Sequence, residues 1–418
     1  MNRSTKARRL VRRFFKCVVL LAIFGVCVIT ILLCSLWIEH KTEMTLPDPT
    51  GPFAVGRAVY DWTDAETVDS LAPMPGAKRE LLVWIWYPAE AQQSAAATDY
   101  LPTELRTAVE YDRGPFIRFL TRDLAKVHAH SWPNAAVSTQ QRSYPLVIMR
   151  AGASLEVWNF TTLAEDLASH GYVVIGFDAP YRSRVVVFPD GRVIKRLPQN
   201  DPERCLERAG QERERCADKL QNAWTSDTAF VLDRLTALNA TDPSGSLTGR
   251  LDMSRIGIFG HSFGGATAAQ FCHDDARCKV GIDVDGALHG SVIQAGIDRP
   301  FMFLLSDHSR EGDPEATQIL AKMRSVYARL PPNGREFLEI RGASHFLFAD
   351  DGVLKSRIML RILRALGIIR IDGRRQLAIT AYGLRSFFDE HLKGAGASAP
   401  KIPSPLYREL RVLESKSE

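Results

Sequence analysis

The sequence predicts an α/β fold, with a mainly parallel central sheet covered by helices on both faces and preceded by one N-terminal transmembrane helix. Apolar runs rich in β-branched and aromatic residues alternate with helical patterns through residues 78–395, as in a sheet built from strand and helix units. Several of these runs are apolar at every position, which is typical of strands buried on both faces. A long uncharged segment precedes them, and the composition, 45% hydrophobic and 24% charged, is sufficient for a large core.

The uncharged segment covers residues 17–37. A helix needs about 20 residues to cross roughly 30 Å of hydrocarbon, so this length predicts a membrane span. Basic residues precede it, and by the positive-inside rule the N-terminus stays in the cytoplasm while the chain after Ile38 lies on the extracytoplasmic side, periplasmic or extracellular. A cleaved signal peptide is the alternative, but its apolar core is only about 7 to 15 residues long and ends in a small-x-small site. Residues 33–37 read Leu-Cys-Ser-Leu-Trp, so we expect an uncleaved signal anchor.

Charge and the content of proline and glycine indicate how the chain is divided into segments. Beyond the basic N-terminus the sequence is close to neutral, which argues against nucleic acid as a partner. Prolines and glycines without periodicity between residues 38 and 77 indicate a stalk and an irregular entry, so folded structure is expected to start near Arg79. We therefore expect five segments: a basic cytoplasmic segment 1–16, a signal anchor 17–37, a stalk and irregular entry 38–77, a folded catalytic domain 78–395 and a C-terminal tail 396–418.

Periodicity predicts the elements of the folded domain. Strands are expected at 81–87, 145–149, 172–177, 256–259, 280–284 and 301–305, and helices at 163–169, 226–238, 264–271, 316–328, 353–366 and 377–392. Residues 103–135 interrupt this alternation with a basic amphipathic stretch, which is either a lid that touches lipid or a covering helix. Residues 183–222 start as a hairpin that turns at Pro189-Asp190-Gly191 and continue as a charged, solvated helix.

Four cysteines lie outside the apolar segment: Cys205, Cys216, Cys272 and Cys278. Their spacing permits two local disulfides, 205 to 216 and 272 to 278, but four cysteines allow three connectivities and the sequence does not choose among them. None of the four belongs to a Cys-x-x-Cys pair, which disfavours zinc. We expect no cofactor, no metal and no obligate protein partner.

The motif that carries chemistry is Gly260-His261-Ser262-Phe263-Gly264-Gly265, which follows a strand-like run and precedes a helix of small residues. A Gly-x-Ser-x-Gly sequence in that context is the nucleophile elbow of the α/β-hydrolase fold, in which a sharp turn exposes the serine above the sheet. Ser262 is therefore the candidate nucleophile. The backbone N–H of Phe263, the next residue, is the expected first donor of an oxyanion hole.

A serine hydroxyl needs a general base, and the base needs a carboxylate that fixes its tautomer. His345 is the candidate base. Asp285 and Asp307 both follow predicted strands, where this fold carries the acid, so strand position leaves the two open. With either residue the chain order is Ser, Asp, His, as in this fold.

Four blocks of the sequence resemble the plasma platelet-activating-factor acetylhydrolase family, also called the group VII, calcium-independent, phospholipase A2 family. They are Tyr-Pro-Leu-Val at 144–147, Leu-Ala-Ser-His-Gly at 167–171, the elbow at 260–267, and Arg-Gly-Ala-Ser-His with the following Phe-Ala-Asp at 341–350. The resemblance covers roughly residues 79–393. It implies that Asp285, in the context Gly281-Ile282-Asp283-Val284-Asp285, is the acid that completes a triad with Ser262 and His345.

The resemblance also implies a second oxyanion donor after the strand at 145–149. The family carries a His-Gly pair there, whereas this chain reads Ala151-Gly152-Ala153-Ser154, and by position Ala153 N–H is the donor. The implied reaction is metal-free hydrolysis of short or oxidised acyl groups from the middle position of glycerophospholipids. The residues alone indicate ester hydrolysis through an acyl-enzyme. The alternatives are a general short-chain carboxylesterase, a dienelactone-hydrolase-like enzyme, and a membrane-anchored binding protein without turnover.

Overall fold

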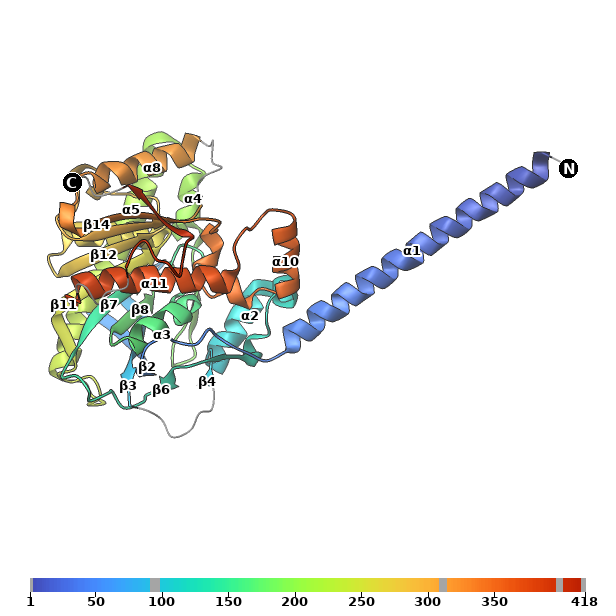
Figure 1. The fold of residues 1–418 in the computed structure, drawn as a ribbon. Helices are drawn as coiled ribbons and strands as arrows, with labels where there is room; N and C mark the ends of the chain where they lie inside the picture. The colour runs from blue at the N-terminus through green and yellow to red at the C-terminus, as the bar shows by residue number, and fades with distance from the viewer. Residues whose placement is uncertain (1–2, 91–97, 308–313, 396–400, 415–418) are drawn as a thin grey trace.

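A ten-stranded sheet forms the centre of the molecule (Figure 1), for which a computed structural model describes residues 3–90, 98–307, 314–395 and 401–414. The strand order is β15-β14-β13-β12-β11-β7-β8-β3-β2-β6. The six neighbours from β14 to β8 run parallel, and β3 and β15 pair antiparallel with the two ends of that block. The strands of this sheet are β2 (Ala54–Val68), β3 (Lys78–Ala89), β6 (Trp132–Pro133), β7 (Tyr144–Arg150), β8 (Val173–Asp178), β11 (Leu251–His261), β12 (Cys278–Val284), β13 (Phe301–Leu305), β14 (Arg335–Ile340) and β15 (Leu410–Glu414).

Helices cover both faces of this sheet. In β7, Val147 and Met149 pack into the core on one face, while Leu146 and Ile148 pack into the core on the other, because successive side chains of a strand point in opposite directions. The first core contains residues of α2 (Thr103–Leu120), α3 (Thr161–Ser169) and α11 (Gly373–His391), and the second contains residues of α5 (Gly210–Ala240), α6 (Phe263–Asp274), α7 (Val292–Ala295) and α8 (Pro314–Tyr327). The predicted mainly parallel sheet between two helical layers is confirmed.

Smaller elements complete the fold. A three-stranded sheet of order β1-β5-β4 is formed by β1 (Met44–Thr45), β4 (Thr98–Asp99) and β5 (Val127–Ala129). The predicted hairpin after residue 183 is confirmed as β9 (Val185–Val187) and β10 (Val193–Lys195), which pair antiparallel. The charged segment that follows forms α4 (Pro202–Leu206) and the first part of α5.

Three sequence expectations about the elements are wrong. Residues 54–68 were expected to be irregular but form β2, whose solvent-facing positions are polar, so that it lacks a continuous apolar run. Strands β14 and β15 were not expected, because Arg-Glu-Phe-Leu-Glu-Ile is half charged and β15 lies within the predicted C-terminal tail. The single helix expected at 353–366 is divided into α9 (Asp351–Leu354) and α10 (Arg357–Ala365), since the chain is extended at Lys355 and Ser356.

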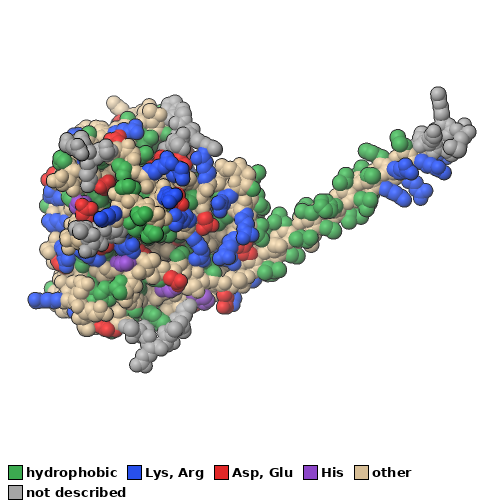
Figure 2. Space-filling view, viewed as in Figure 1, with side chains coloured by type: hydrophobic (Ala, Val, Ile, Leu, Met, Phe, Trp, Pro, Cys, Tyr) green, Lys and Arg blue, Asp and Glu red, His purple; other side chains and the backbone are tan. Residues whose placement is uncertain are grey.

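Helix α1 (Arg3–Lys41) contains the predicted span and projects away from the body of the molecule (Figure 1). Its segment Arg8–Lys41 is long and apolar enough to cross a membrane, and the most apolar 18 residues of that segment are not buried against the rest of the chain. Figure 2 shows its hydrophobic side chains exposed along its length. The helix does not end in a loose stalk, because its last turn packs against the folded domain: the Trp37 ring stacks on Phe119 of α2 at 6.4 Å, and the buried His40 Nδ1 lies 2.7 Å from Thr121 O.

Glu39, in the last turn of α1, holds this junction together. Its carboxylate accepts hydrogen bonds from Arg122 Nη2 at 3.0 Å, Ser356 Oγ at 2.5 Å and the backbone N–H of Arg357 at 2.7 Å. Arg357 is the first residue of α10, so the carboxylate lies at the positive end of that helix. Burial alone would raise the pKa of Glu39, but these hydrogen bonds together hold it below its ordinary value.

We expect Glu39→Gln to lower the free energy of unfolding by about 1 to 3 kcal/mol, because the variant leaves Arg122 without its charged partner and removes the anion at the α10 N-terminus. Glu43→Gln is the matched control, since its carboxylate pairs with Lys126 but is 65% exposed, and exposed ion pairs contribute little to the free energy of unfolding. Thermal unfolding of the full chain in detergent measures both. Equal losses in the two variants would contradict the role assigned to Glu39.

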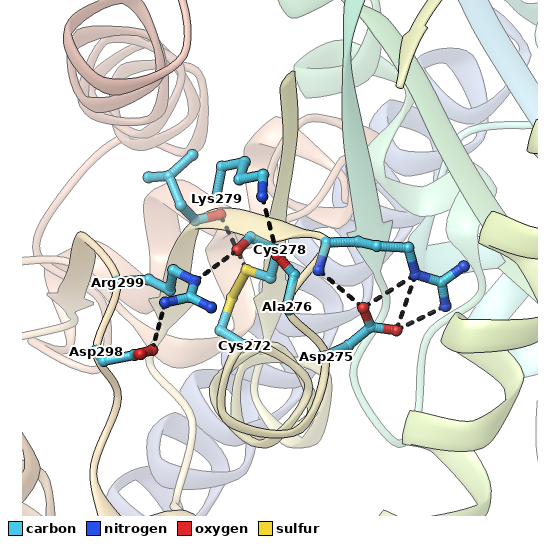
Figure 3. Close-up of a disulfide and its surroundings, with 9 residues drawn as sticks. Cys272, Asp275, Ala276, Cys278, Lys279, Asp298 and Arg299 are labelled. Atoms are coloured by element: carbon cyan, nitrogen blue, oxygen red, sulfur yellow. Dashed lines mark hydrogen bonds and ion pairs between the residues drawn. A yellow bond between two sulfur atoms is a disulfide. The ribbon is translucent and has the colours of Figure 1, made fainter. Parts of the chain in front are cut away.

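The four cysteines form the two local disulfides, Cys205–Cys216 and Cys272–Cys278. Figure 3 shows the second, which joins the last turn of α6 to the first residue of β12. Arg299 Nε donates a hydrogen bond to Cys278 O at 3.2 Å beside this disulfide (Figure 3). Because α6 starts directly after Ser262 and β12 ends directly before Asp285, this disulfide ties together the two elements that carry these candidate residues.

Candidate active site

Ser262 lies on a sharp turn between β11 and α6. Its φ is 56° and its ψ is −125°, a conformation that costs a non-glycine residue free energy and is found mainly at functional sites. The turn is fixed by a hydrogen bond from Ser262 N to Val284 O at 2.9 Å. A Cβ at Gly260 would lie 2.0 Å from Gly264 O. Only glycine therefore permits strand and helix to approach so closely around the serine.

Asp285 and His345 are in direct contact. His345 Nδ1 lies 2.8 Å from Asp285 Oδ2, and Asp285 Oδ1 accepts a hydrogen bond from Ser306 N at 2.9 Å. The Asp285 side chain is 4% exposed and the His345 side chain 37%. A buried carboxylate on Nδ1 favours the tautomer with its proton on that nitrogen, which leaves Nε2 as the acceptor on the open side of the ring.

The other two aspartates near this sheet edge have different partners. Asp307 Oδ2 accepts from Gly342 N at 2.7 Å and from Arg370 Nη1 at 3.2 Å, so it fixes the loop ahead of His345 and not the imidazole itself. Asp283 is fully buried beneath the elbow, where its Oδ1 accepts from Gly286 N at 2.8 Å, and burial holds its pKa well above the ordinary value. Of the two acids that strand position left open, the one in contact with His345 is Asp285.

Ser262 and His345 line one cavity of about 100 Å³. Its other lining residues come from the loop after β7, from α4, from the end of β11, and from η5 (His345–Leu347) and the segment that follows it: Gly152, Ala153, Ser154, Leu155, Glu203, His261, Phe346, Asp351 and Lys355. Ser154 Oγ donates to Glu203 Oε1 at 2.5 Å, so the insertion that the sequence presents as a solvated helix contributes a wall of the cavity. Pockets for drug-sized ligands occupy about 300 to 1,000 Å³, so this cavity admits only a small group.

The two backbone segments expected to carry oxyanion donors both lie against Ser262. Phe263 is the first residue of α6, and the first N–H groups of a helix have no acceptor within the helix. On the other side, a Cβ at Gly152 would lie 3.1 Å from the Ser262 Cβ. The side chains of Ala153 and Phe263 belong to the same small apolar cluster, which fixes the two segments relative to each other.

Two residues that support His345 were not assigned a role from the sequence. Gln376, fully buried in α11, accepts from Ser344 N at 3.0 Å and donates to Ser344 O at 2.8 Å. His261 Nε2 lies 2.9 Å from His345 O, and the two imidazole centroids are 4.6 Å apart. His261 belongs to the elbow motif, but no motif marks Gln376, whose role depends on how α11 packs.

The buried His261 gives the site a measurable pH dependence. Burial, and then the neighbouring His345, lower the pKa of His261 to about 3. The unfolded imidazole takes up a proton near pH 6.5 and the folded one does not, so this stability is present above pH 6.5 and is lost as the pH falls toward 3. We expect the unfolding free energy of His261→Gln to decline less steeply between pH 6.5 and 4 than that of the wild type, by up to about 1.4 kcal/mol per pH unit. Denaturant titrations across this range measure the slope, and parallel slopes would contradict the prediction.

A serine on a strained strand-to-helix turn, beside a histidine bound to a buried carboxylate and above a mainly parallel sheet, defines the class of the α/β hydrolases. A solved structure of this kind, ferulic acid esterase from Streptomyces cinnamoneus, matches with a TM-score of 0.72 and 27% identity, covering 89% of this chain and 100% of that one. The chain belongs to the family described as platelet-activating factor acetylhydrolase, isoform II, whose model matches residues 38–395. The family resemblance seen in the sequence is thereby confirmed.

Two curated relatives span most of the chain. A probable 1-alkyl-2-acetylglycerophosphocholine esterase from Arthroderma benhamiae is 24% identical over 89% of this chain and 95% of its own length. The platelet-activating factor acetylhydrolase of Cavia porcellus is 23% identical over 87% of this chain and 84% of its own length. With this family and this fold, the protein is a carboxylic ester hydrolase.

Proposed function

We propose that this protein is a membrane-anchored serine esterase that releases short or oxidised acyl chains from glycerophospholipids through an acyl-enzyme. The observation that carries the proposal is the convergence of Ser262 and His345 on a cavity of about 100 Å³, with Asp285 bound behind the histidine. A cavity of that size accepts a short acyl group and leaves the rest of a lipid outside. Both curated relatives have names that refer to the acetyl ester of such a lipid.

The proposed reaction has two halves. Ser262 Oγ attacks the ester carbonyl carbon while His345 Nε2 takes its proton, and the Asp285 carboxylate stabilises the resulting imidazolium. The N–H groups of Phe263 and Ala153 donate to the developing oxyanion. The intermediate then expels the alcohol, which receives the proton from His345 and leaves the acyl group on Ser262. Water, activated by the same imidazole, hydrolyses the acyl-enzyme and regenerates the serine.

The proposed location rests on α1 and on the disulfides. Residues 17–37 would cross the bilayer, with the basic segment 1–16 in the cytoplasm and the catalytic domain on the extracytoplasmic side. Disulfides form and persist in oxidising compartments, so the pairs Cys205–Cys216 and Cys272–Cys278 support that orientation. An enzyme tethered in this way has its substrate in the neighbouring leaflet.

A general short-chain carboxylesterase is the second candidate. The similarity to ferulic acid esterase, at 27% identity, favours it, as does Ala151-Gly152 at the position where the family resemblance implies His-Gly. The fold alone does not decide whether the substrate is a glycerophospholipid with a short or oxidised acyl chain or a general short-chain ester.

The test compares two esters on the full chain in detergent micelles. We expect turnover of 1-alkyl-2-acetylglycerophosphocholine and of p-nitrophenyl butyrate, both lost in Ser262→Ala. Long-chain phosphatidylcholine should be a poor substrate, because its acyl group exceeds the cavity. Turnover of the nitrophenyl ester alone would instead establish the general esterase, and serine-independent turnover would contradict the mechanism.

A further inference from the structure

A groove of about 330 Å³ lies between α10 and the start of α11, away from the catalytic cavity. Four arginine side chains line it: Arg357, Arg361, Arg364 and Arg374. Its floor includes the buried Val353 and Leu360. Three of these arginines recur along one side of a helix of nine residues, at spacings of four and three, which brings their guanidinium groups to the same face.

These guanidinium groups lack acidic partners. In the part of the chain that the structure describes, none of the four lies within ion-pair distance of a carboxylate. Asp372 also lines the groove, but its carboxylate accepts the backbone N–H groups of Arg374 and Arg375 at the N-terminus of α11. Arg374 Nη2 has only a 3.4 Å contact with Thr45 O. Burial, followed by the positive charge of Arg357, lowers the pKa of Arg374, although the carboxylates of Asp372 and Asp48 act in the opposite direction. With four arginines and one aspartate in its lining, the groove carries an excess of positive charge.

The groove adjoins the end of the proposed membrane span. The N–H of Arg357 is bonded to Glu39, two residues beyond the apolar segment of α1. Figure 2 shows Lys and Arg side chains gathered where α1 meets the body of the molecule. Three large apolar side chains beside the groove are exposed: Ile362, Leu366 and Ile368. Apolar groups next to cationic ones are typical of surfaces that lie at a membrane interface.

We propose that this arginine groove binds a phosphate group, as carried by an anionic phospholipid headgroup or by free phosphate. Guanidinium groups recognise phosphate oxygens through paired, charge-assisted hydrogen bonds, and they lose little hydration free energy in doing so. The location of the groove within the bilayer interface rests on the proposed membrane anchoring, whereas the phosphate chemistry rests on the arginines alone. Occupation by a headgroup would hold the catalytic domain against the leaflet that supplies its substrate.

The experiment measures binding to the full chain in uncharged detergent micelles. The probes are short-chain ether-linked phosphatidylglycerol, the matching ether-linked phosphatidylcholine, and inorganic phosphate, none of which contains an ester of the kind that the enzyme cleaves. The variant is Arg361→Gln with Arg364→Gln, both exposed, and the control with the same change in charge is Arg142→Gln with Arg208→Gln, also exposed and outside the groove. Turnover of p-nitrophenyl butyrate reports separately on the catalytic site.

We expect the anionic lipid to bind the wild type on the order of tenfold more tightly than the zwitterionic lipid, and the groove variant to lose that difference. The control pair should retain it, and all three proteins, wild type, groove variant and control, should hydrolyse the nitrophenyl ester at similar rates. Binding of inorganic phosphate with the same dependence on Arg361 and Arg364 would support the site with free phosphate as its source. The proposal would be overturned if neither the anionic lipid nor inorganic phosphate bound. It would also be overturned if the control pair lost the preference for the anionic lipid to the same extent as the groove variant, even where esterase activity is intact.

Discussion

Ser262→Ala is expected to reduce kcat for ester hydrolysis by roughly 10⁴ to 10⁶, because the variant has no nucleophile to carry the acyl group. Residual turnover would come from the oxyanion donors and from substrate binding. The fold should be unaffected, since alanine experiences the same backbone strain as serine at φ 56° and loses only one hydroxyl. Single-turnover kinetics, together with thermal unfolding of the same preparation, measure both effects.

Ser154→Ala is the matched control for that variant. Ser154 lines the same cavity, but its hydroxyl donates to Glu203, so its loss should cost less than about tenfold in kcat. A Ser262→Ala enzyme that retained a tenth of wild-type activity would refute the assignment of the nucleophile. Equal losses in the two variants would point to a general disturbance of the cavity.

Asp285→Asn is expected to reduce kcat by about 10⁴, because an amide at that position neither stabilises the imidazolium nor keeps the proton on His345 Nδ1. Asp307→Asn should cost less than about tenfold, since Asp307 holds Gly342 N and Arg370 and does not contact the imidazole. Comparing these two variants is informative because both aspartates follow a strand of the same sheet and differ chiefly in the group that each carboxylate contacts.

The ranking of these two variants is the measured quantity. A greater loss in Asp307→Asn than in Asp285→Asn would assign the acid to the end of β13. Comparable losses would indicate that the loop ahead of His345 matters as much as the charge behind it, and would contradict the triad proposed here. In both variants the melting temperature should be recorded, so that loss of folded protein is not counted as loss of chemistry.

Much of the fold follows from local sequence patterns. Strands β7, β8, β12 and β13 are apolar runs buried on both faces, so their positions could be predicted directly. Strand β2 could not, because its exposed positions are polar and its pairing with β3 is a long-range interaction. The pairing of the cysteines was also open until the positions of α6 and β12 were known.

For the site, the sequence by itself predicted Ser262 as the candidate nucleophile and the N–H of Phe263 as a candidate oxyanion donor, because the elbow is a continuous motif whose glycines are required by local geometry. It also provided a histidine and two candidate acids in the expected chain order. Strand position left Asp285 and Asp307 open and the family resemblance favoured Asp285, but only the tertiary structure put Asp285 in contact with His345. Only the tertiary structure, too, located Gln376 behind the histidine loop and brought Glu39 of α1 to the N-terminus of α10. The physical reason is that these contacts join residues from 32 to more than 300 positions apart, and hydrogen bonds between such distant residues depend on how the strands and helices pack.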